Sequence, residues 1–431
     1  MTEKNVQAPF DAEGPQSEKE RTEQAMRGFV REFGRTSALY IEACVHCGMC
    51  AEACHFYEVT KDAKYTPIWK IEPLKQAYKR EYGPFAPLFR LLNLKSKINA
   101  DELENWQELI YDSCTLCGRC SLVCPMGIDI SGLVEHARHG MAQAGLVPKE
   151  LWALAHRDDD GEPGIADFRA LVRTLSVQHA IAIPLDKPKA DILCTISTVE
   201  LTQYPDAILA MAKVMNHLGL DWTFRTDGFE ASSAGVHAGE VGVQKQANLK
   251  IIEAAIDCGA RLVVLPECGH AYHELRWSGA DDLGAPLPFA VQHISEFLAD
   301  QVTSGALKLN KVDKSATFHD PCQVGRRGGA IEAPRTVLAA LGLDLHEMTP
   351  TKDTNWCCGG GGGVSAIRRA DPLRHAMFHL KREQIEETGA ELALTSCSGC
   401  RHSFDEAQTH FKETLSMGSL LELVAANLSE A

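Results

Sequence analysis

The sequence predicts an α+β and α/β architecture, in which a helical, cysteine-rich N-terminal domain precedes a duplicated α/β domain. Three observations predict it. One cysteine motif occurs twice within the first 130 residues. Buried-strand and helix patterns alternate from about residue 190 onward, and cysteines recur there at matching intervals. With 431 residues, 45% of them hydrophobic, the chain can build two or three domains with cores of their own.

The charge and hydropathy of the chain exclude several classes of function. Its 43 basic and 58 acidic residues give a net charge of −15, which offers no basic surface to nucleic acid. No run reaches the ~18 apolar residues that span a bilayer, so we expect no membrane span. Residues 1–35 predict a polar tail leading into a helix, without the apolar segment of an export signal. We therefore expect a cytoplasmic protein.

The cysteines point to metal binding. Thiols stay reduced in the cytoplasm, so sixteen cysteines are not expected to form disulfides. Twelve of them fall into four tight groups, whereas structural cysteines would be scattered. The groups are Cys44–Cys54, Cys114–Cys124, Cys357–Cys358 and Cys397–Cys400, and the cysteines outside them are Cys194, Cys258, Cys268 and Cys322.

The first two groups share the spacing C-x2-C-x2-C-x3-C, within a predicted domain over residues 36–150. This is the spacing of bacterial ferredoxins, in which the fourth cysteine ligates the other cluster. Zinc explains it less well, because zinc prefers two separated cysteine pairs. We therefore predict two cubane [4Fe–4S] clusters, one held by Cys44, Cys47, Cys50 and Cys124, the other by Cys114, Cys117, Cys120 and Cys54.

The loops of the two motifs differ slightly. Gly48 and Gly118 allow each loop to bend close to a cluster. Pro125 follows the second motif, whereas His55 takes that place in the first, where we expect it to change loop stiffness and not ligation. The insert of about sixty residues between the motifs is either a helical wrapper or a docking surface for a partner subunit.

The second domain reads as two α/β rounds, over residues 190–300 and 301–431, after a linker at 151–189. The rounds have matching spacing, since 74 residues separate Cys194 from Cys268 and 75 separate Cys322 from Cys397. In the second round the cysteines fall where strands end or loops turn, the usual place for ligands in α/β sheets. Adjacent cysteines diverge too much to hold one small ion, but they can bridge different irons of a larger cluster. The glycines at 359–363 would let backbone N–H groups reach cluster sulfurs.

Three motifs carry a family resemblance. His319-Asp-Pro-Cys322, Cys357-Cys358-Gly359-Gly360 and Ser396-Cys397-Ser-Gly-Cys400 resemble the CCG domain of heterodisulfide reductases. Behind a two-cluster ferredoxin domain, they resemble the fused catalytic subunit of the membrane-associated heterodisulfide reductase (the HdrD/DsrK-like family) over about residues 38–405. The resemblance implies a catalytic non-cubane [4Fe–4S] cluster held by Cys322, Cys357, Cys358, Cys397 and Cys400.

The resemblance implies an oxidoreductase of sulfur or energy metabolism. Two cubanes would relay electrons to or from the non-cubane cluster, which reduces or forms a disulfide or trisulfide of a thiol or a small cysteine-bearing protein. The expected partner is a membrane cytochrome b-type or other redox subunit, with the chain peripheral on the cytoplasmic side. The alternative is a non-catalytic electron-transfer subunit of a flavin dehydrogenase for glycolate, lactate or glycerol 3-phosphate. Four residues near the ligands either orient an anionic thiol or are structural: Arg326, Arg327, Arg401 and His402.

The first round departs from the five-cysteine pattern. Cys194 and Cys268 occupy the first and fourth cysteine places, but Ser232-Ser233 replaces the pair and Ala271 replaces the last cysteine. We therefore expect one non-cubane cluster and not two. The first round is either a degenerate scaffold half or holds a mononuclear metal at Cys194, His237, Cys268, His270 and His273; Cys258, on a helix, is expected in the core.

Overall fold

The computed structural model describes residues 17–31, 34–83, 86–91, 100–157, 165–412 and 416–429. These residues form two compact units. The first unit comprises residues up to 157 together with 234–243 and 359–377, and the second comprises the rest. Most of the predicted polar tail, residues 1–16, lies outside the described residues.

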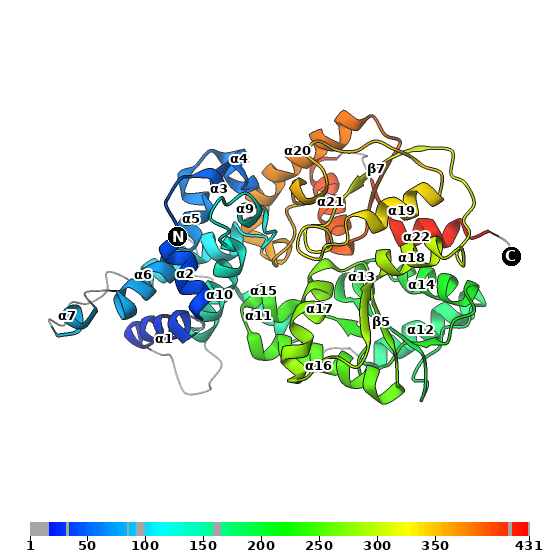
Figure 1. Cartoon of the computed structure of the whole chain (residues 1–431), viewed down its shortest axis with the longest axis horizontal. Helices are drawn as coiled ribbons and strands as arrows, with labels where there is room; N and C mark the ends of the chain where they lie inside the picture. Colours follow the sequence, from blue (N-terminus) through cyan, green and yellow to red (C-terminus); the bar gives the residue numbers. More distant parts are fainter. Residues whose placement is uncertain are drawn as a thin grey trace. The chain divides into compact units, whose positions relative to one another are not determined.

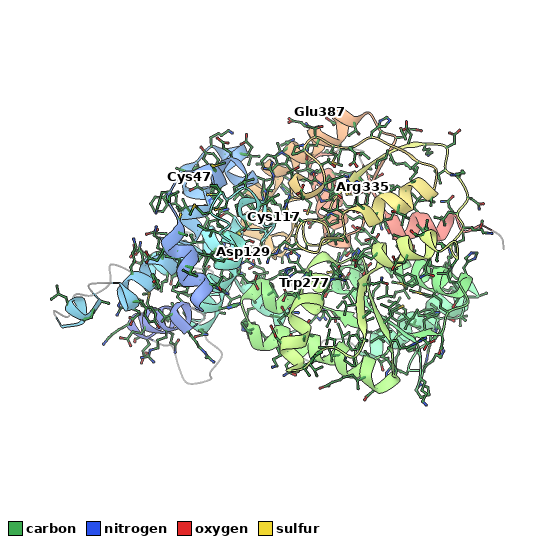
Figure 2. The ribbon with its side chains drawn as sticks, in the orientation of Figure 1. Cys47, Cys117, Asp129, Trp277, Arg335 and Glu387 are labelled. Carbon is green, nitrogen blue, oxygen red and sulfur yellow. The ribbon has the colours of Figure 1, made fainter. Side chains whose placement is uncertain are left out.

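The described part of the first unit is helical, as predicted. Its elements are α1 (Glu18–Arg31), α2 (Arg35–Ala43), α3 (Met49–Glu52), α4 (His55–Thr60), α5 (Pro67–Lys70), α6 (Glu72–Tyr82), α7 (Ala86–Leu91), α8 (Ala100–Gln107), the π-helical turn Glu108–Asp112, α9 (Arg119–Leu122), α10 (Ile130–Gln143), α11 (Lys149–Ala155) and α15 (Ala234–Ala238). The central helix α10 begins at Asp129 (Figure 2), whose carboxylate accepts a hydrogen bond from the Gly132 N–H at 3.1 Å. Helix α1 crosses it closely, since a Cβ on Gly28 would lie 2.7 Å from Gly140 Cα.

The second unit contains two four-stranded parallel sheets with the same strand order, β3-β1-β5-β6 and β8-β7-β9-β10. The first consists of β1 (Ile192–Cys194), β3 (Trp222–Thr223), β5 (Leu262–Leu265) and β6 (Ala290–His293), and the second of β7 (Ser315–His319), β8 (Asp344–Leu345), β9 (Leu392–Thr395) and β10 (Met417–Ser419). Figure 1 labels β5 and β7, which are inner strands of the two sheets. The predicted α/β duplication is therefore confirmed.

Helices connect these strands as in other parallel sheets. They are α12 (Ile165–His179), α13 (Thr198–Gln203), α14 (Asp206–His217), α16 (Val241–Cys258), α17 (Gly269–Leu283), α18 (Ile294–Thr303), α19 (Glu332–Ala340), α20 (Asp371–Thr388), α21 (Ser398–Phe411) and α22 (Leu420–Ala426); the short strands β2 (Ile196–Ser197) and β4 (Glu230–Ala231) pair separately. The predicted linker over 151–189 contains most of α11 and all of α12, and its residues 158–164 are outside the described ones. No helix in the described ranges is both long and apolar enough to cross a membrane.

The duplication extends to a segment in each half that belongs to the first unit, residues 234–243 and 359–377. The chain leaves the second unit directly after Ser233 in the first half and directly after Cys358 in the second. Within the first unit, both segments meet the same side chain. Arg138 Nη1 donates to the His237 carbonyl at 3.0 Å and to the Gly362 carbonyl at 2.7 Å. Ser232-Ser233 and Cys357-Cys358 thus occupy corresponding places.

The position of Cys194 corrects one correspondence. Cys194 lies within β1, where it pairs with Val264, the third residue of β5, and its side chain is fully buried. The second half has Phe318 at that place, opposite Leu394 of β9. Cys322 instead lies three residues beyond the end of β7, so the assignment of Cys194 to the first cysteine place is wrong. A thiol packs there as a small apolar side chain.

Candidate metal centres

The first set of cysteines lines one cavity in the first unit: Cys44, Cys47, Cys50 and Cys124. Three of them lie on the loop that enters α3 through Gly48, whose φ of 83° favours glycine. Burial, together with the neighbouring thiols of Cys44, Cys47 and Cys124, raises the pKa of Cys50 to about 11. Cys47, labelled in Figure 2, is exposed, so this cavity reaches the surface of the unit.

The second set lines another cavity of the first unit: Cys54, Cys114, Cys117 and Cys120. Burial holds the pKa of Cys120 well above its usual value, and Cys117, Cys114 and Cys54 add to the effect. The fourth cysteine of each motif therefore lies with the first three of the other motif, the grouping that crossed ligation requires. Four thiols around each cavity are a donor set suited to a [4Fe–4S] cubane.

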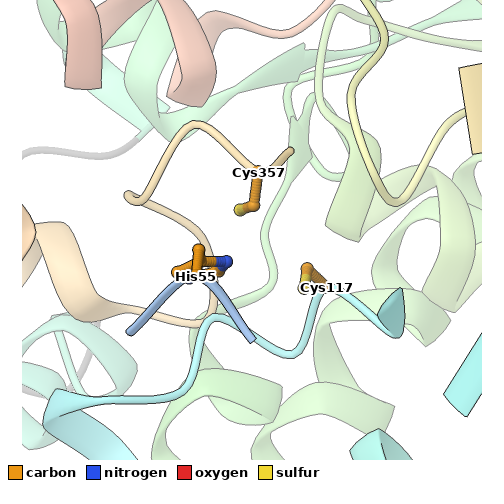
Figure 3. A group of neighbouring side chains, drawn as sticks. All are labelled: His55, Cys117 and Cys357. Atoms are coloured by element: carbon orange, nitrogen blue, oxygen red, sulfur yellow. The ribbon is translucent and has the colours of Figure 1, made fainter. Parts of the chain in front are cut away.

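His55 contributes to the second cavity in a way that the spacing of the motif does not predict. Its buried imidazole hydrogen-bonds to Cys117, and Figure 3 shows the two side chains. Burial lowers the pKa of His55, which favours the neutral ring. The expectation that His55 changes only loop stiffness therefore omits a direct contact with a candidate ligand. Histidine in the place of the motif's proline was the available sequence signal.

In the second unit, the structure gathers cysteines from two parts of the second half. The Cys400 thiol donates hydrogen bonds to the sulfurs of Cys358 and Cys397. Cys397 caps the N-terminus of α21, and its pKa is lowered by the hydrogen bond from Cys400 and by nearby backbone N–H groups. Cys322 is buried in the turn after β7, the strand that pairs with β9 ahead of Cys397. All five predicted ligands are buried.

Three polar residues to which the motif analysis gave no role complete this five-cysteine site. The His319 imidazole has a nitrogen within 4.8 Å of the sulfurs of Cys358 and Cys400. The Asn355 side chain lies 3.3 Å from His319 Nδ1 and accepts a hydrogen bond from Lys381 Nζ at 2.5 Å. Burial lowers the pKa of Lys381 to about 7, while the thiolate charges of Cys357 and Cys358 oppose that change. Lys381 lies mid-helix outside any motif, so only its burial reveals it.

The four candidate substrate-orienting residues hold neighbouring parts of the second unit. Arg401 Nη1 lies 2.6 Å from Glu422 Oε1, and its guanidinium lies 4.1 Å from the Tyr204 ring centroid. The other contacts are Arg326 with the carbonyls of Asp353 and Asn355, Arg327 Nε with His273 Nε2 at 3.4 Å, and His402 Nε2 with Glu406 Oε2 at 3.6 Å. The contacts of Arg326, Arg327 and Arg401 join separate segments and favour the structural interpretation, whereas the contact of His402 lies within α21.

The structure does not assemble the alternative mononuclear site of the first half. Cys194 is enclosed in β1, and the His270 ring lies 3.2 Å from Gln323 Nε2. Among the described residues, no three ligand atoms of the proposed set lie within 4.8 Å of one another. Cys268 lies instead beside Cys397, whose charge adds to burial in raising the pKa of Cys268. Cys258 is buried on α16, as predicted.

Comparison with known proteins identifies both cysteine-rich regions. A 4Fe-4S dicluster domain matches residues 40–128, and a cysteine-rich (CCG) domain matches residues 316–405. The HdrD polypeptide of the dihydromethanophenazine:CoB–CoM heterodisulfide reductase of Methanosarcina barkeri is 29% identical, over 90% of this chain and 94% of that protein. The chain is a distant relative of HdrD.

Other relatives extend this group of iron–sulfur oxidoreductase subunits. An Hdr-like menaquinol oxidoreductase iron-sulfur subunit 2 of Archaeoglobus fulgidus is 26% identical, over 96% of this chain and 84% of that protein. A probable membrane-anchored ferredoxin of Chromohalobacter salexigens is 26% identical, over 92% of this chain and 61% of that protein. The dicluster domain implies two cubanes, and the grouped cysteines of the CCG domain indicate a further cluster.

Proposed function

We propose that the chain is an iron–sulfur thiol/disulfide oxidoreductase subunit. Its catalytic site would be a non-cubane [4Fe–4S] cluster held by Cys322, Cys357, Cys358, Cys397 and Cys400. The observation that supports it best is the contact of Cys400 with both Cys358 and Cys397, which brings residues 42 positions apart in sequence into one buried group. Each cubane would be held by the four cysteines that line one cavity of the first unit.

The reaction needs two electrons and two protons to convert one disulfide into two thiols. Bound clusters supply electrons one at a time and, at the five-cysteine site, an iron–sulfur surface for the substrate sulfur. The chain's own residues hold the thiolates apart from water, and Lys381 can hold or release a proton beside Cys357 and Cys358, because burial lowers its pKa to about 7. A trisulfide, or the reverse reaction that forms a disulfide, would use the same site.

We further propose a membrane redox subunit, of cytochrome b type, as the electron partner, with this chain on its cytoplasmic side. The names of two relatives support this, because one is a menaquinol oxidoreductase subunit and the other a membrane-anchored ferredoxin. The second candidate function is electron transfer alone, beside a flavin dehydrogenase. The ferredoxin name of the Chromohalobacter relative favours it.

A spectroscopic experiment separates the two functions. Anaerobically purified protein is oxidised in the presence of small thiols or persulfide-carrying proteins and examined by EPR. Catalysis at the five-cysteine site predicts a paramagnetic signal that appears only with thiol present. A protein that carries both cubane signals but shows no thiol-dependent signal with any of these thiols would overturn the catalytic proposal and favour electron transfer.

A further inference from the structure

Lys70 is a buried cation in contact with a cysteine of the second set. It ends α5 and is 2% exposed. Its Nζ lies 3.4 Å from Cys54 Sγ, donates to the Ser113 carbonyl, and lies 4.9 Å from the centre of the Phe56 ring. Among the described residues, no carboxylate lies within salt-bridge distance of this ammonium. The potential counter-charge in contact with this ammonium is therefore the Cys54 thiolate.

Sulfurs of the second set surround the Lys70 side chain. Burial works against the charge, but Cys54, Cys114 and Cys120 hold the pKa of Lys70 above its usual value. A second buried cation lies on another element around the same cysteines. Arg138, on α10, is fully buried, and its Nη2 donates to the Cys114 carbonyl at 2.7 Å. Two positive charges without access to water thus flank the second set.

The first set lies in a different environment. Cys47 is exposed, and its neighbours Val45 and Met49 are 65% and 50% exposed. Lys75 of α6 is also buried, at 6% exposed, and its Nζ lies 2.6 Å from Nε2 of His46, in the loop between Cys44 and Cys47. The first set thus combines an exposed thiol with a buried lysine that contacts a histidine ring of its loop, whereas in the second set the buried lysine contacts a ligand sulfur itself.

The charge of a cluster decides which of two environments an added electron prefers. An electron makes a thiolate-ligated cluster more negative, so burial alone lowers the reduction potential of the second cluster below that of the exposed first one. A buried cation in contact with a ligand sulfur opposes this, and at low dielectric its effect is strong.

We propose that Lys70 is a positioning residue whose fixed charge raises the reduction potential of the cluster held by Cys54, Cys114, Cys117 and Cys120, making it the electron acceptor of the first. The proposal rests on the two-cubane part of the proposed function. Electrons entering at the exposed first cluster would then collect at the second, away from solvent.

EPR-monitored redox titration of purified protein tests the proposal. Lys70→Met keeps the length and removes the charge, Lys70→Arg restores the charge, and Lys79→Met removes an exposed charge from α6 as a control. We expect Lys70→Met to lower one cubane midpoint, so that the ratio of reduced to oxidised cluster falls at least tenfold at a fixed potential, about 59 mV for one electron. Lys70→Arg should recover most of this shift, and Lys79→Met should leave both midpoints unchanged.

Iron analysis of each variant detects the loss of a cluster. If Lys70→Met loses about four irons, one cluster's worth, Lys70→Gln is titrated instead, because its amide can still donate to the Ser113 carbonyl without a charge. Cys54→Ala assigns the midpoints, since crossed ligation predicts that it removes the second cluster. Unchanged midpoints in an iron-replete uncharged variant, or an equal fall in Lys70→Arg, would overturn the proposal.

The titration is independent of the five-cysteine chemistry. The cubane midpoints are measured without thiol, whereas the catalytic proposal depends on the thiol-dependent signal. Absence of that signal in wild-type protein would overturn the catalytic proposal without affecting the Lys70 result. Unchanged midpoints in the Lys70 variants would overturn the Lys70 proposal without affecting the catalytic one.

Discussion

The two halves of the second unit share a strand order but differ in the residues that follow corresponding elements. After β9 the chain continues to Cys397 and Cys400, whereas after β5 it continues to Cys268 and Ala271. Helices α16 and α20 both contain 18 residues, and the eleventh residue is the buried Ile251 in one and the buried Lys381 in the other. An apolar contact in one half thus replaces a charge in the other.

This difference shows that the fold and the chemistry depend on separate residues. The inner strands of both sheets are largely buried, so each half can form its sheet without metal. The candidate ligands lie at strand ends and in loops, where substitution leaves the sheet intact. A duplicated unit can therefore lose its cluster in one half and keep its architecture.

The sharpest test of the comparison exchanges side chains at the paired positions. Cys358→Ser should abolish the thiol-dependent EPR signal and disulfide turnover, because Cys358 contacts Cys400 within the site. Cys357→Ser should do the same, and both variants should keep the cubane signals. The matched variants Ser232→Ala and Ser233→Ala, at the corresponding places of the first half, should leave every signal unchanged. A loss of turnover in Ser232→Ala or Ser233→Ala would contradict the difference between the halves.

The iron content tests whether the first half lacks a cluster. Two cubanes and one non-cubane cluster of four irons each predict about twelve irons per chain. Ser232-Ser233 and Ala271 stand where the second half has Cys357-Cys358 and Cys400, so we expect no fourth site. Iron and acid-labile sulfide analysis of anaerobically purified protein checks this number. A reproducible value near sixteen would show that the first half holds a cluster after all.

Exchanging Lys381 for its counterpart should produce a smaller effect. Lys381→Ile removes the buried amine beside Cys357 and Cys358 and leaves Asn355 Oδ1 without its donor. We expect disulfide turnover to fall about tenfold, which corresponds to about 1.4 kcal/mol, with cubane midpoints unchanged. Lys245→Ile, at an exposed position of α16, is the matched control for the loss of a lysine. Steady-state kinetics together with EPR would measure both, and full activity of Lys381→Ile would exclude a role for its amine.

Sequence reasoning predicted the repeated and spaced features and missed those that depend on tertiary packing. The cysteine spacing and the apolar strand patterns predicted the helical first unit and the duplicated α/β unit. The same spacing placed Cys194 wrongly, because counting residues between cysteines cannot tell a strand interior from a strand end. Lys70 and Lys381 were missed because a lysine in a helical stretch is usually solvated, and only the fold shows that these two are buried.

A pair of buried carboxyl groups at the junction of the halves provides the last test, through the pH dependence of stability. Glu267 follows β5 of the first half and accepts two hydrogen bonds from the second half. Its carboxylate accepts from the Leu421 N–H at 3.1 Å, and its backbone carbonyl accepts from the Ser398 N–H at 2.6 Å. Glu200 accepts from the Glu267 N–H at 3.2 Å. Burial raises the pKa of Glu200 to about 7 and that of Glu267 to about 8, and their hydrogen bonds only partly oppose it.

These shifts predict that the protein becomes less stable as the pH rises from 6 to 8. Both groups have a higher pKa in the folded chain than the ordinary glutamate value of 4.5, so the folded state holds protons that the unfolded state has lost. The stabilisation is complete below pH 4.5 and disappears as the pH passes the folded values. The free energy of unfolding should fall by at most about 1.4 kcal/mol per pH unit for each carboxyl still protonated.

Urea unfolding of the Glu267→Gln variant should show a flatter dependence of this free energy on pH between 6 and 8, because its amide keeps the acceptor oxygen without a titrating proton. Glu253→Gln, at an exposed position of α16, should retain the wild-type slope. If Glu267→Gln also retained that slope, the junction between the halves would not depend on a neutral Glu267.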